Sequence, residues 1–302
     1  MQLNPKLTSW GILFILVLIW GSSFILIKGG LEVYSSQVVG AIRIVVSFVV
    51  LLPFAVAHLR KVPPGKIKYI LIVAVIGTGI PAFLFARAQT VIDSSLAGIL
   101  NSLTPLFTMI IGIMFFRQKT SWQNVLGVFV GLIGALGLIY VTSDKSFEFH
   151  FSFAIYVIIA TVLYAIHSNM IKYYLQEVNT ITIVSVGFFI IGIPTMIYLF
   201  GFSDFVEVFI NDERGLEGFM YIAILGFLAS AFAIIAYNRL VQLTNAIFAS
   251  SVTYFVPVLA LFWGILDGEK FPIFASLFIA LILLGVFLVN RNNKRKRKLN
   301  NQ

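Results

Sequence analysis

The chain contains ten continuous apolar runs of about 18–22 residues, the length that a helix needs to cross the hydrocarbon core of a bilayer. Of its 302 residues, 60% are hydrophobic and only 11% are charged, whereas soluble domains average about 45–50% apolar and about 25% charged residues. Membrane-spanning strands would alternate over about ten residues, whereas these runs are unbroken and therefore predict helices. The predicted spans are residues 10–28, 37–58, 67–87, 94–116, 122–143, 153–173, 180–200, 217–239, 245–266 and 271–290.

Lysine and arginine divide unequally between the predicted connections, and an excess of positive charge marks the cytoplasmic side of a membrane protein. With the N-terminus inside, fifteen of the 21 basic residues fall on the inner side, five on the outer side, and Arg43 within a span. Six of the fifteen belong to the tail, residues 291–302. We therefore expect both termini to be cytoplasmic, the protein to lie in the cytoplasmic (inner) membrane, and the tail to contact lipid headgroups rather than nucleic acid.

The two halves of the sequence repeat each other. A shift of 152 residues places 65–116 on 217–268 and aligns Pro105 with Pro257. Each half holds five predicted spans, and because five is odd, the second half enters the membrane from the opposite side. Inverted repeats of this kind are typical of secondary transporters that open alternately to either side. The predicted repeats are residues 8–143 and 151–290.

A proline interrupts the same point of the fourth and ninth spans, in NSLTP (101–105) and VTYFVP (252–257). Neither Pro105 nor Pro257 can donate to the carbonyl four residues earlier, so each breaks the helical bonding there. A freed carbonyl must meet a side chain or a cavity rather than lipid. Paired breaks in corresponding halves indicate a binding site, although prolines also kink helices simply for packing.

Polar and aromatic side chains recur at helical spacing beside these breaks and on the first, third, sixth and eighth spans. Thr78 and Phe85 lie seven residues apart on one predicted face, and Ser230 and Tyr237 repeat that spacing. An aromatic, weakly polar cavity of this kind suits amino acids or similar metabolites. The predicted substrate-binding residues are Trp20, Ser23, Thr78, Phe85, Asn101, Ser102, Tyr164, His167, Ser230, Tyr237, Ser251 and Tyr254.

All twelve acidic residues lie in predicted loops or at span ends. The membrane interior then lacks the carboxylate that exchange of cationic drugs for protons needs, which favours a substrate with its own carboxylate or many hydroxyls. Arg43 either attracts such a carboxylate, gates the outer mouth, or snorkels to the headgroups or bonds freed carbonyls. His167 either binds substrate, relays a proton, or is a neutral histidine bonded between helices.

The remaining features concern cofactors and packing. The chain has no cysteine, and its three histidines are scattered, so we expect no metal site and no cofactor. Gly127 and Gly131 form a GxxxG pair in the fifth span, which predicts close helix packing within the monomer or a dimer seam. We expect a monomer or a weak homodimer.

Three stretches, LIWGSSFILIK, AGILNSLTPLF and FVPVLALFWGILDGEK, together resemble the EamA-type transporters of the drug/metabolite transporter superfamily. The resemblance extends over residues 10–290. It implies ten helices around a central cavity, with the first, third, fourth, sixth, eighth and ninth spans surrounding it, and it implies export. The family ends its fourth and ninth spans with a glycine–glutamate pair; this chain has Gly268-Glu269 in the ninth but Arg117-Gln118 in the fourth.

We therefore expect a secondary transporter that moves small metabolites, amino acids or related compounds first among them, by alternating access. One alternative is a channel or a non-transporting scaffold, although channels usually ring their pores by oligomer symmetry. The other is a membrane-embedded enzyme, which would need a nucleophile–base pair, a metal cluster or paired carboxylates at depth. The sequence offers no HExxH motif, no buried aspartate pair and one mid-span histidine.

Overall fold

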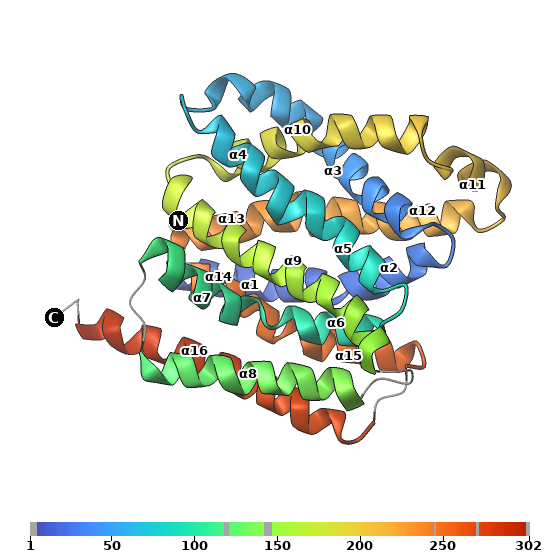
Figure 1. The fold of residues 1–302 in the computed structure, drawn as a ribbon. Helices are drawn as coiled ribbons and strands as arrows, with labels where there is room; N and C mark the ends of the chain where they lie inside the picture. Colours follow the sequence, from blue (N-terminus) through green and yellow to red (C-terminus); the bar gives the residue numbers. More distant parts are fainter. Residues whose placement is uncertain (1–4, 118–120, 142–146, 245, 270–271, 300–302) are drawn as a thin grey trace.

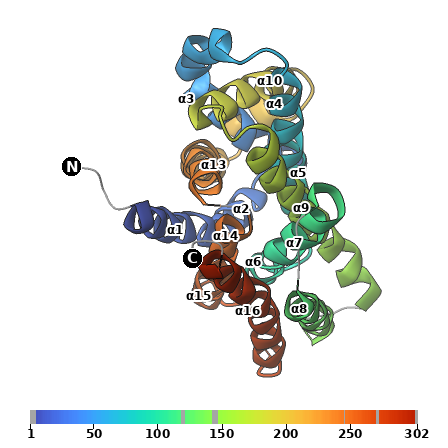
Figure 2. The same cartoon turned by 90° about the vertical axis from the view of Figure 1, so that its left-hand side faces the viewer.

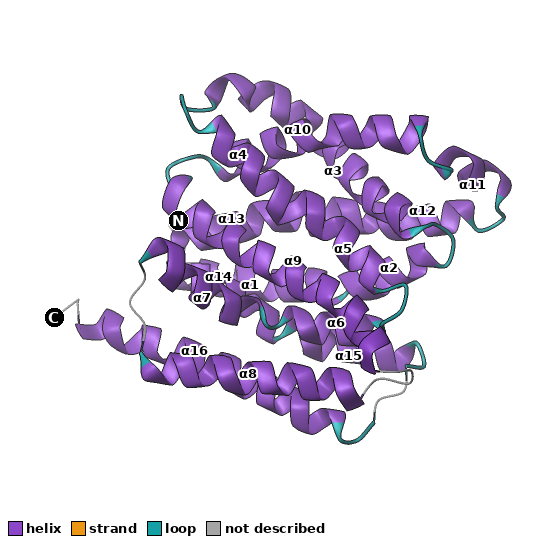
Figure 3. Ribbon diagram, in the orientation of Figure 1, coloured by secondary structure: helices purple, strands orange, loops and turns teal. Residues whose placement is uncertain are grey.

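Helices form the regular structure of the molecule. The computed structural model describes residues 5–117, 121–141, 147–244, 246–269 and 272–299, and this part of the chain contains no β-strand (Figure 3). The α-helices are α1 (Pro5–Gly21), α2 (Ser23–Leu31), α3 (Ser36–His58), α4 (Ile67–Ala74), α5 (Ile80–Ala88), α6 (Ser94–Asn101), α7 (Thr104–Phe116), α8 (Trp122–Val141), α9 (Phe147–Tyr174), α10 (Thr180–Gly201), α11 (Phe205–Asn211), α12 (Gly215–Ile224), α13 (Ala233–Leu243), α14 (Ala246–Ser250), α15 (Val256–Leu266) and α16 (Ala275–Leu299).

Seven helical runs within the described ranges are long and apolar enough to cross a membrane, with mean hydropathies between 1.8 and 2.4. Three shorter apolar helical stretches are Val125–Leu138, Val256–Leu266 and Ala275–Gly285. The protein is therefore a multi-pass helical membrane protein. All of these stretches fall on the predicted runs, while the count of ten spans and the cytoplasmic termini stay predictions. Figure 1 places both marked chain ends at the left-hand end of the bundle.

Helices from the two halves of the sequence pack against one another. α3 packs along α10 at one edge of the bundle, and α8 packs along α16 at the opposite edge (Figures 1 and 2). Between these edges, α5 and α7 pack on α9, just as α13 and α15 pack on α1. Each of these contacts in one half thus has a counterpart in the other half, while the inverted repeat itself stays a prediction.

Glycines bring α8 and α16 close together. A Cβ placed on Gly285 would lie 2.5 Å from the Gly127 carbonyl oxygen and 2.5 Å from the Gly131 nitrogen. A Cβ on Gly134 would lie 2.8 Å from the Ile282 nitrogen. Small residues allow such backbone approach inside a bilayer, so the GxxxG pair is used within the monomer, where two further glycines extend it.

Four long helical runs depart from α-helical geometry partway along. Val75–Gly79 between α4 and α5, and Leu225–Phe232 between α12 and α13, are π-helical segments. The chain also breaks between α6 and α7, and runs as a 3₁₀ turn over Ser251–Tyr254 between α14 and α15. Each half of the sequence thus contributes one π-helical segment and one break. Such irregular segments inside helices often mark functional sites.

The two prolines start new helices rather than kink continuous ones. Pro105 lies in the first turn of α7 and Pro257 in the first turn of α15, positions where a missing N–H costs nothing. The carbonyl of Asn101 accepts a hydrogen bond from the Thr104 hydroxyl at 2.7 Å. A neighbouring side chain therefore satisfies this carbonyl at the break.

Candidate functional site

A cavity lies at the centre of the bundle, among the interrupted helices. It holds about 720 Å³ of empty space, a figure that includes its opening to the exterior. Both halves of the chain contribute to it. Its lining residues are Trp20, Ser23, Phe24, Ile27, Arg43, Gly77, Phe85, Asn101, Thr104, Tyr164, His167, Ala229, Ile234, Tyr237 and Thr253.

Seven of the residues predicted to bind substrate line this cavity. They come from the expected first, third, fourth, sixth and eighth spans. The ninth span reaches the cavity through Thr253, which was not among the predicted residues. The second span joins them through Arg43. The seven are Trp20, Ser23, Phe85, Asn101, Tyr164, His167 and Tyr237.

The shared face predicted for Thr78 and Phe85 is wrong, because Thr78 lines a smaller side pocket against α10 instead of the central cavity. Thr78 lies inside the π-helical segment Val75–Gly79, whose wider turns rotate the helix face, so α-helical spacing from Thr78 to Phe85 no longer applies. Ser230, inside the other π-helical segment, is buried and bonded to Arg43.

Ser102 lies at the helix break rather than on the cavity wall. Its hydroxyl donates to the carbonyl of Ile99 at 2.6 Å, because the chain turns here between α6 and α7. The side chains of Ser251 and Tyr254 lie outside what the structure describes. Their placement on the cavity stays a prediction.

Arg43 does not snorkel. The side chain is only 8% exposed and points into the cavity wall, where its Nε donates to the Ser230 hydroxyl at 2.6 Å. The Tyr164 hydroxyl also interacts with the guanidinium. α3 and the π-helical segment Leu225–Phe232 thus place a permanent positive charge at the centre of the bundle.

His167 lies between the central cavity and the side pocket. Its Nδ1 is 3.1 Å from the carbonyl oxygen of Val73, and its Nε2 is 3.0 Å from the Oδ1 of Asn238. A Cβ on Gly77 would lie 1.9 Å from Nδ1, so only glycine leaves room for the ring. His167 is therefore bonded between helices, as one interpretation predicted, and also lines the cavity.

Aromatic rings form much of the remaining wall. Trp20 donates through Nε1 to the Ala229 carbonyl at 3.1 Å, and its ring centroid is 5.1 Å from that of Tyr237. On the other side, Phe85 stacks on Tyr164 with centroids 5.9 Å apart. The cavity thus offers flat apolar surfaces beside the Arg43 charge.

The sequence reasoning missed several lining residues. Gly77, Ala229 and Ile234 carry no polar signal, and Phe24 and Ile27 look like ordinary apolar span residues. Thr104 could have been found, since it directly precedes Pro105 and is the hydroxyl within reach of the Asn101 carbonyl.

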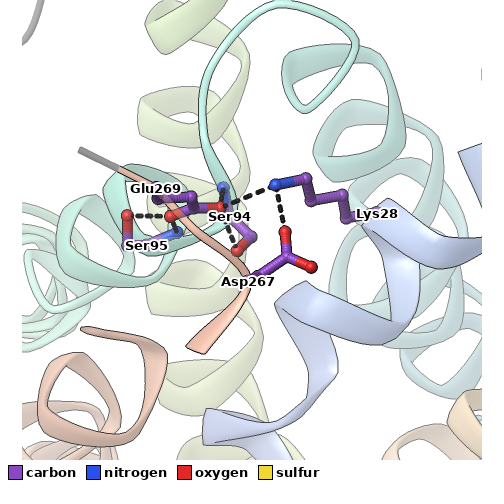
Figure 4. Close-up of polar contacts among 5 residues, drawn as sticks. All are labelled: Lys28, Ser94, Ser95, Asp267 and Glu269. Carbon is purple, nitrogen blue, oxygen red and sulfur yellow. Dashed lines mark hydrogen bonds and ion pairs between the residues drawn. The ribbon is translucent and has the colours of Figure 1, made fainter. Parts of the chain in front are cut away.

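A second polar cluster, which we name the latch, consists of Lys28, Ser94, Ser95, Asp267 and Glu269 (Figure 4). One Glu269 oxygen accepts from the Ser94 amide at 3.1 Å and the Ser94 hydroxyl at 2.7 Å. The other accepts from the amide of Ser95, at 3.2 Å, and from its hydroxyl. Lys28 forms ion pairs with Asp267 and, at 3.3 Å, with Glu269.

Glu269 caps the N-terminus of α6 from a distant part of the chain. Burial by itself would raise its pKa, but hydrogen bonds from Ser95 and Ser94 and the charge of Lys28 outweigh burial and hold the pKa below its ordinary value. A carboxylate here also meets the positive end of the helix dipole. The latch thereby ties α2, α6 and the connection after α15 together as an ionic cluster.

The other end of the bundle lacks a comparable cluster among the described residues. Lys172, which lies in the last turn of α9 as Lys28 lies in the last turn of α2, bonds the carbonyls of Gln242 at 3.4 Å and Thr244 at 3.0 Å. The described residues also contain no group of three histidine, aspartate or glutamate side chains able to hold a metal ion.

Membrane-crossing helices around a central, partly polar cavity define the class of multi-pass membrane transporters. The model of the EamA-like transporter family matches residues 9–140 and again residues 151–291. The chain belongs to this family.

Named relatives agree with this class. An uncharacterized transporter of Archaeoglobus fulgidus is 24% identical over 93% of this chain and 98% of its own length. The uncharacterized inner membrane transporter YedA of Escherichia coli is 26% identical over 96% of this chain and 92% of its own. A crystal structure with 14% identity superposes with a TM-score of 0.67 over 95% of this chain and 98% of that one, which supports the fold. These names indicate a transporter rather than an enzyme.

Proposed function

We propose that the protein is a secondary transporter that carries small metabolites, first of all amino acids or related compounds, through the central cavity by alternating access. The observation that supports this most is the cavity itself, which is built from both halves and bordered by both π-helical segments and both helix breaks. Such irregular backbone gives a membrane protein polar groups for a ligand at depth.

The latch supplies a gate at one end of the cavity. It lies one residue beyond Ile27, which lines the cavity, and it holds the start of α6 against the connection that follows α15. Breaking the latch would release this end of the cavity. In this proposal the two ends open by turns, and transport runs outward across the cytoplasmic membrane.

Transport by purified protein in proteoliposomes tests the proposal. We expect saturable flux of at least one compound from a panel of amino acids, nucleosides and sugars. Asn101→Ala, which alters the cavity wall, should reduce the flux, whereas the exposed Asn211→Ala on α11 should leave it unchanged. No flux for any compound would refute transport. Flux that never saturates would favour a channel instead.

A further inference from the structure

The buried charge of Arg43 identifies the chemical group that the cavity recognises. Arg43 is the eighth residue of α3, which places it about 10 Å along the helix from its start. An arginine this far inside a membrane protein costs several kcal/mol unless it is paired, and an intramembrane charge therefore marks a functional site. The question is what pairs with it.

The protein groups around Arg43 are neutral and held in place. Ser230 takes the Nε hydrogen, and Tyr164 is the other side chain that interacts with the guanidinium. The Ser47 hydroxyl lies 2.8 Å from the carbonyls of both Arg43 and Gly226, which locks α3 to the π-helical segment. Arg43 lines the cavity, and of its five guanidinium N–H groups the one on Nε is taken by Ser230, which leaves the terminal nitrogens for Tyr164 and for a ligand.

No protein carboxylate reaches this site within the described ranges. The ion pairs of the described residues involve Lys28 and Arg214, both away from the cavity centre, and the cavity lining contains no acidic residue. The cavity is therefore positively charged without a counter-ion from the described protein. A planar guanidinium fits a carboxylate through two parallel hydrogen bonds.

We infer that the transported substrate carries a carboxylate, which binds the terminal nitrogens of Arg43 while the rest of the molecule lies against Trp20, Tyr237 and Phe85. This inference rests on the proposed transport function and names its substrate class. An ammonium group has no carboxylate partner in the cavity lining and meets only aromatic faces and neutral oxygens. Amino acids, hydroxy acids and keto acids fit this site, and the corresponding amines do not.

Thermal unfolding of the purified protein with matched ligands tests the inference. The probes are L-phenylalanine, L-phenylalaninamide and phenethylamine, and L-leucine, L-leucinamide and isoamylamine, which share a side chain and differ at the carboxylate. Lactate, pyruvate and inorganic phosphate complete the panel. We expect the carboxylates to stabilise the protein. The amides and amines should bind with an affinity about tenfold or more below that of the matching carboxylate. Equal binding of an amide or amine, binding of phosphate alone, or no stabilisation by any carboxylate would overturn the inference.

Two variants at the same position make the test specific. Arg43→Gln should lose the preference for the carboxylate over its amide, whereas Arg43→Lys should keep the preference with weaker binding, because lysine retains charge but not the two-pronged geometry. An Arg43→Gln protein that melts as the wild type does and still prefers carboxylates would refute the assignment. If Arg43→Gln does not fold, the matched ligands on wild-type protein still decide.

Failure of this inference can be told apart from failure of the transport function. Saturable flux of sugars or nucleosides, with none for any carboxylate, would leave the transporter intact and refute the role of Arg43. Absence of flux for every compound, despite stabilisation by carboxylates, would instead refute transport and leave the binding site.

Discussion

Replacing Glu269 by glutamine should open the end of the cavity that the latch closes. The carboxylate accepts four hydrogen bonds from Ser94 and Ser95, two of them from backbone amides at the start of α6. Glutamine has nearly the same shape but offers one acceptor oxygen, so its NH₂ group faces a donor amide on the other side. The ion pair with Lys28 is lost as well.

The size of the effect follows from these contacts. Hydrogen bonds to a charged group contribute about 1.5–3 kcal/mol each and neutral ones about 1 kcal/mol. Losing one amide contact outright and the charge from the other three removes about 3 kcal/mol or more. Since about 1.4 kcal/mol changes an equilibrium tenfold, the ratio of open to closed molecules at this end should rise by about 100-fold or more.

Thiol labelling measures this ratio on a clean background, because the chain contains no cysteine. Ile27→Cys places a single thiol on the cavity wall just behind the latch, where Ile27 is almost fully buried. A membrane-impermeant thiol reagent is then applied to vesicles of both orientations. Glu269→Gln should accelerate labelling by tens-fold or more from the side of the membrane on which Lys28 lies.

Asp267→Asn provides the matched control. Asp267 also pairs with Lys28, but it is 39% exposed and caps no helix, so its loss should cost at most about 1 kcal/mol. The thiol of Ile27→Cys should therefore react at nearly the same rate with and without the Asp267→Asn substitution. If Glu269→Gln is folded and its thiol reacts no faster than in the Asp267→Asn protein, the latch is not a gate.

Three further predictions concern single positions. Gly77→Ala should destabilise the protein by about 1–3 kcal/mol in thermal unfolding, because its Cβ would overlap His167, whereas Gly79→Ala in the same π-helical segment meets only ordinary contacts and should cost less. Arg117→Gly should raise stability by about 1 kcal/mol, since Arg117 ends α7 with φ 51°; an unchanged or lower melting temperature would contradict this. Because the folded-state pKa of Glu269 is lowered, its contribution to stability is complete above the ordinary value of 4.5 and is lost as the pH falls through the lowered pKa. Melting temperatures measured against pH should therefore show this acid-side loss in the wild type but not in Glu269→Gln.

The sequence predicted what depends on local pattern. Unbroken apolar runs located the membrane helices. The resemblance to EamA-type transporters implied that the spans of Trp20, Asn101 and Tyr237 surround one cavity, and these three residues line it. The apolar pattern could not show the π-helical segments, which add a residue to a turn without changing hydrophobicity. Thr78 was misplaced for that reason.

Contacts between segments that lie far apart in the sequence could not be predicted either. The latch joins residues near positions 28, 94 and 269, and nothing local to Glu269 indicates that it caps α6. The short helix α11 was also not predicted, because Phe205–Asn211 is far below the length of a membrane span and lies in the longest predicted connection.

The unequal ends of the cavity bear on the direction of transport. Two identical halves would make the two closed states equal in energy, but the ends differ in their contacts: Lys28 pairs with the carboxylates of Asp267 and Glu269, whereas the contacts of Lys172 include the carbonyls of Gln242 and Thr244. The ionic contacts of the latch favour closure at the Lys28 end. If the N-terminus is cytoplasmic, as the basic residues predict, Lys28 lies at the outer face, and a molecule whose latch is closed can load only from the cytoplasmic side, which is what the proposed export requires.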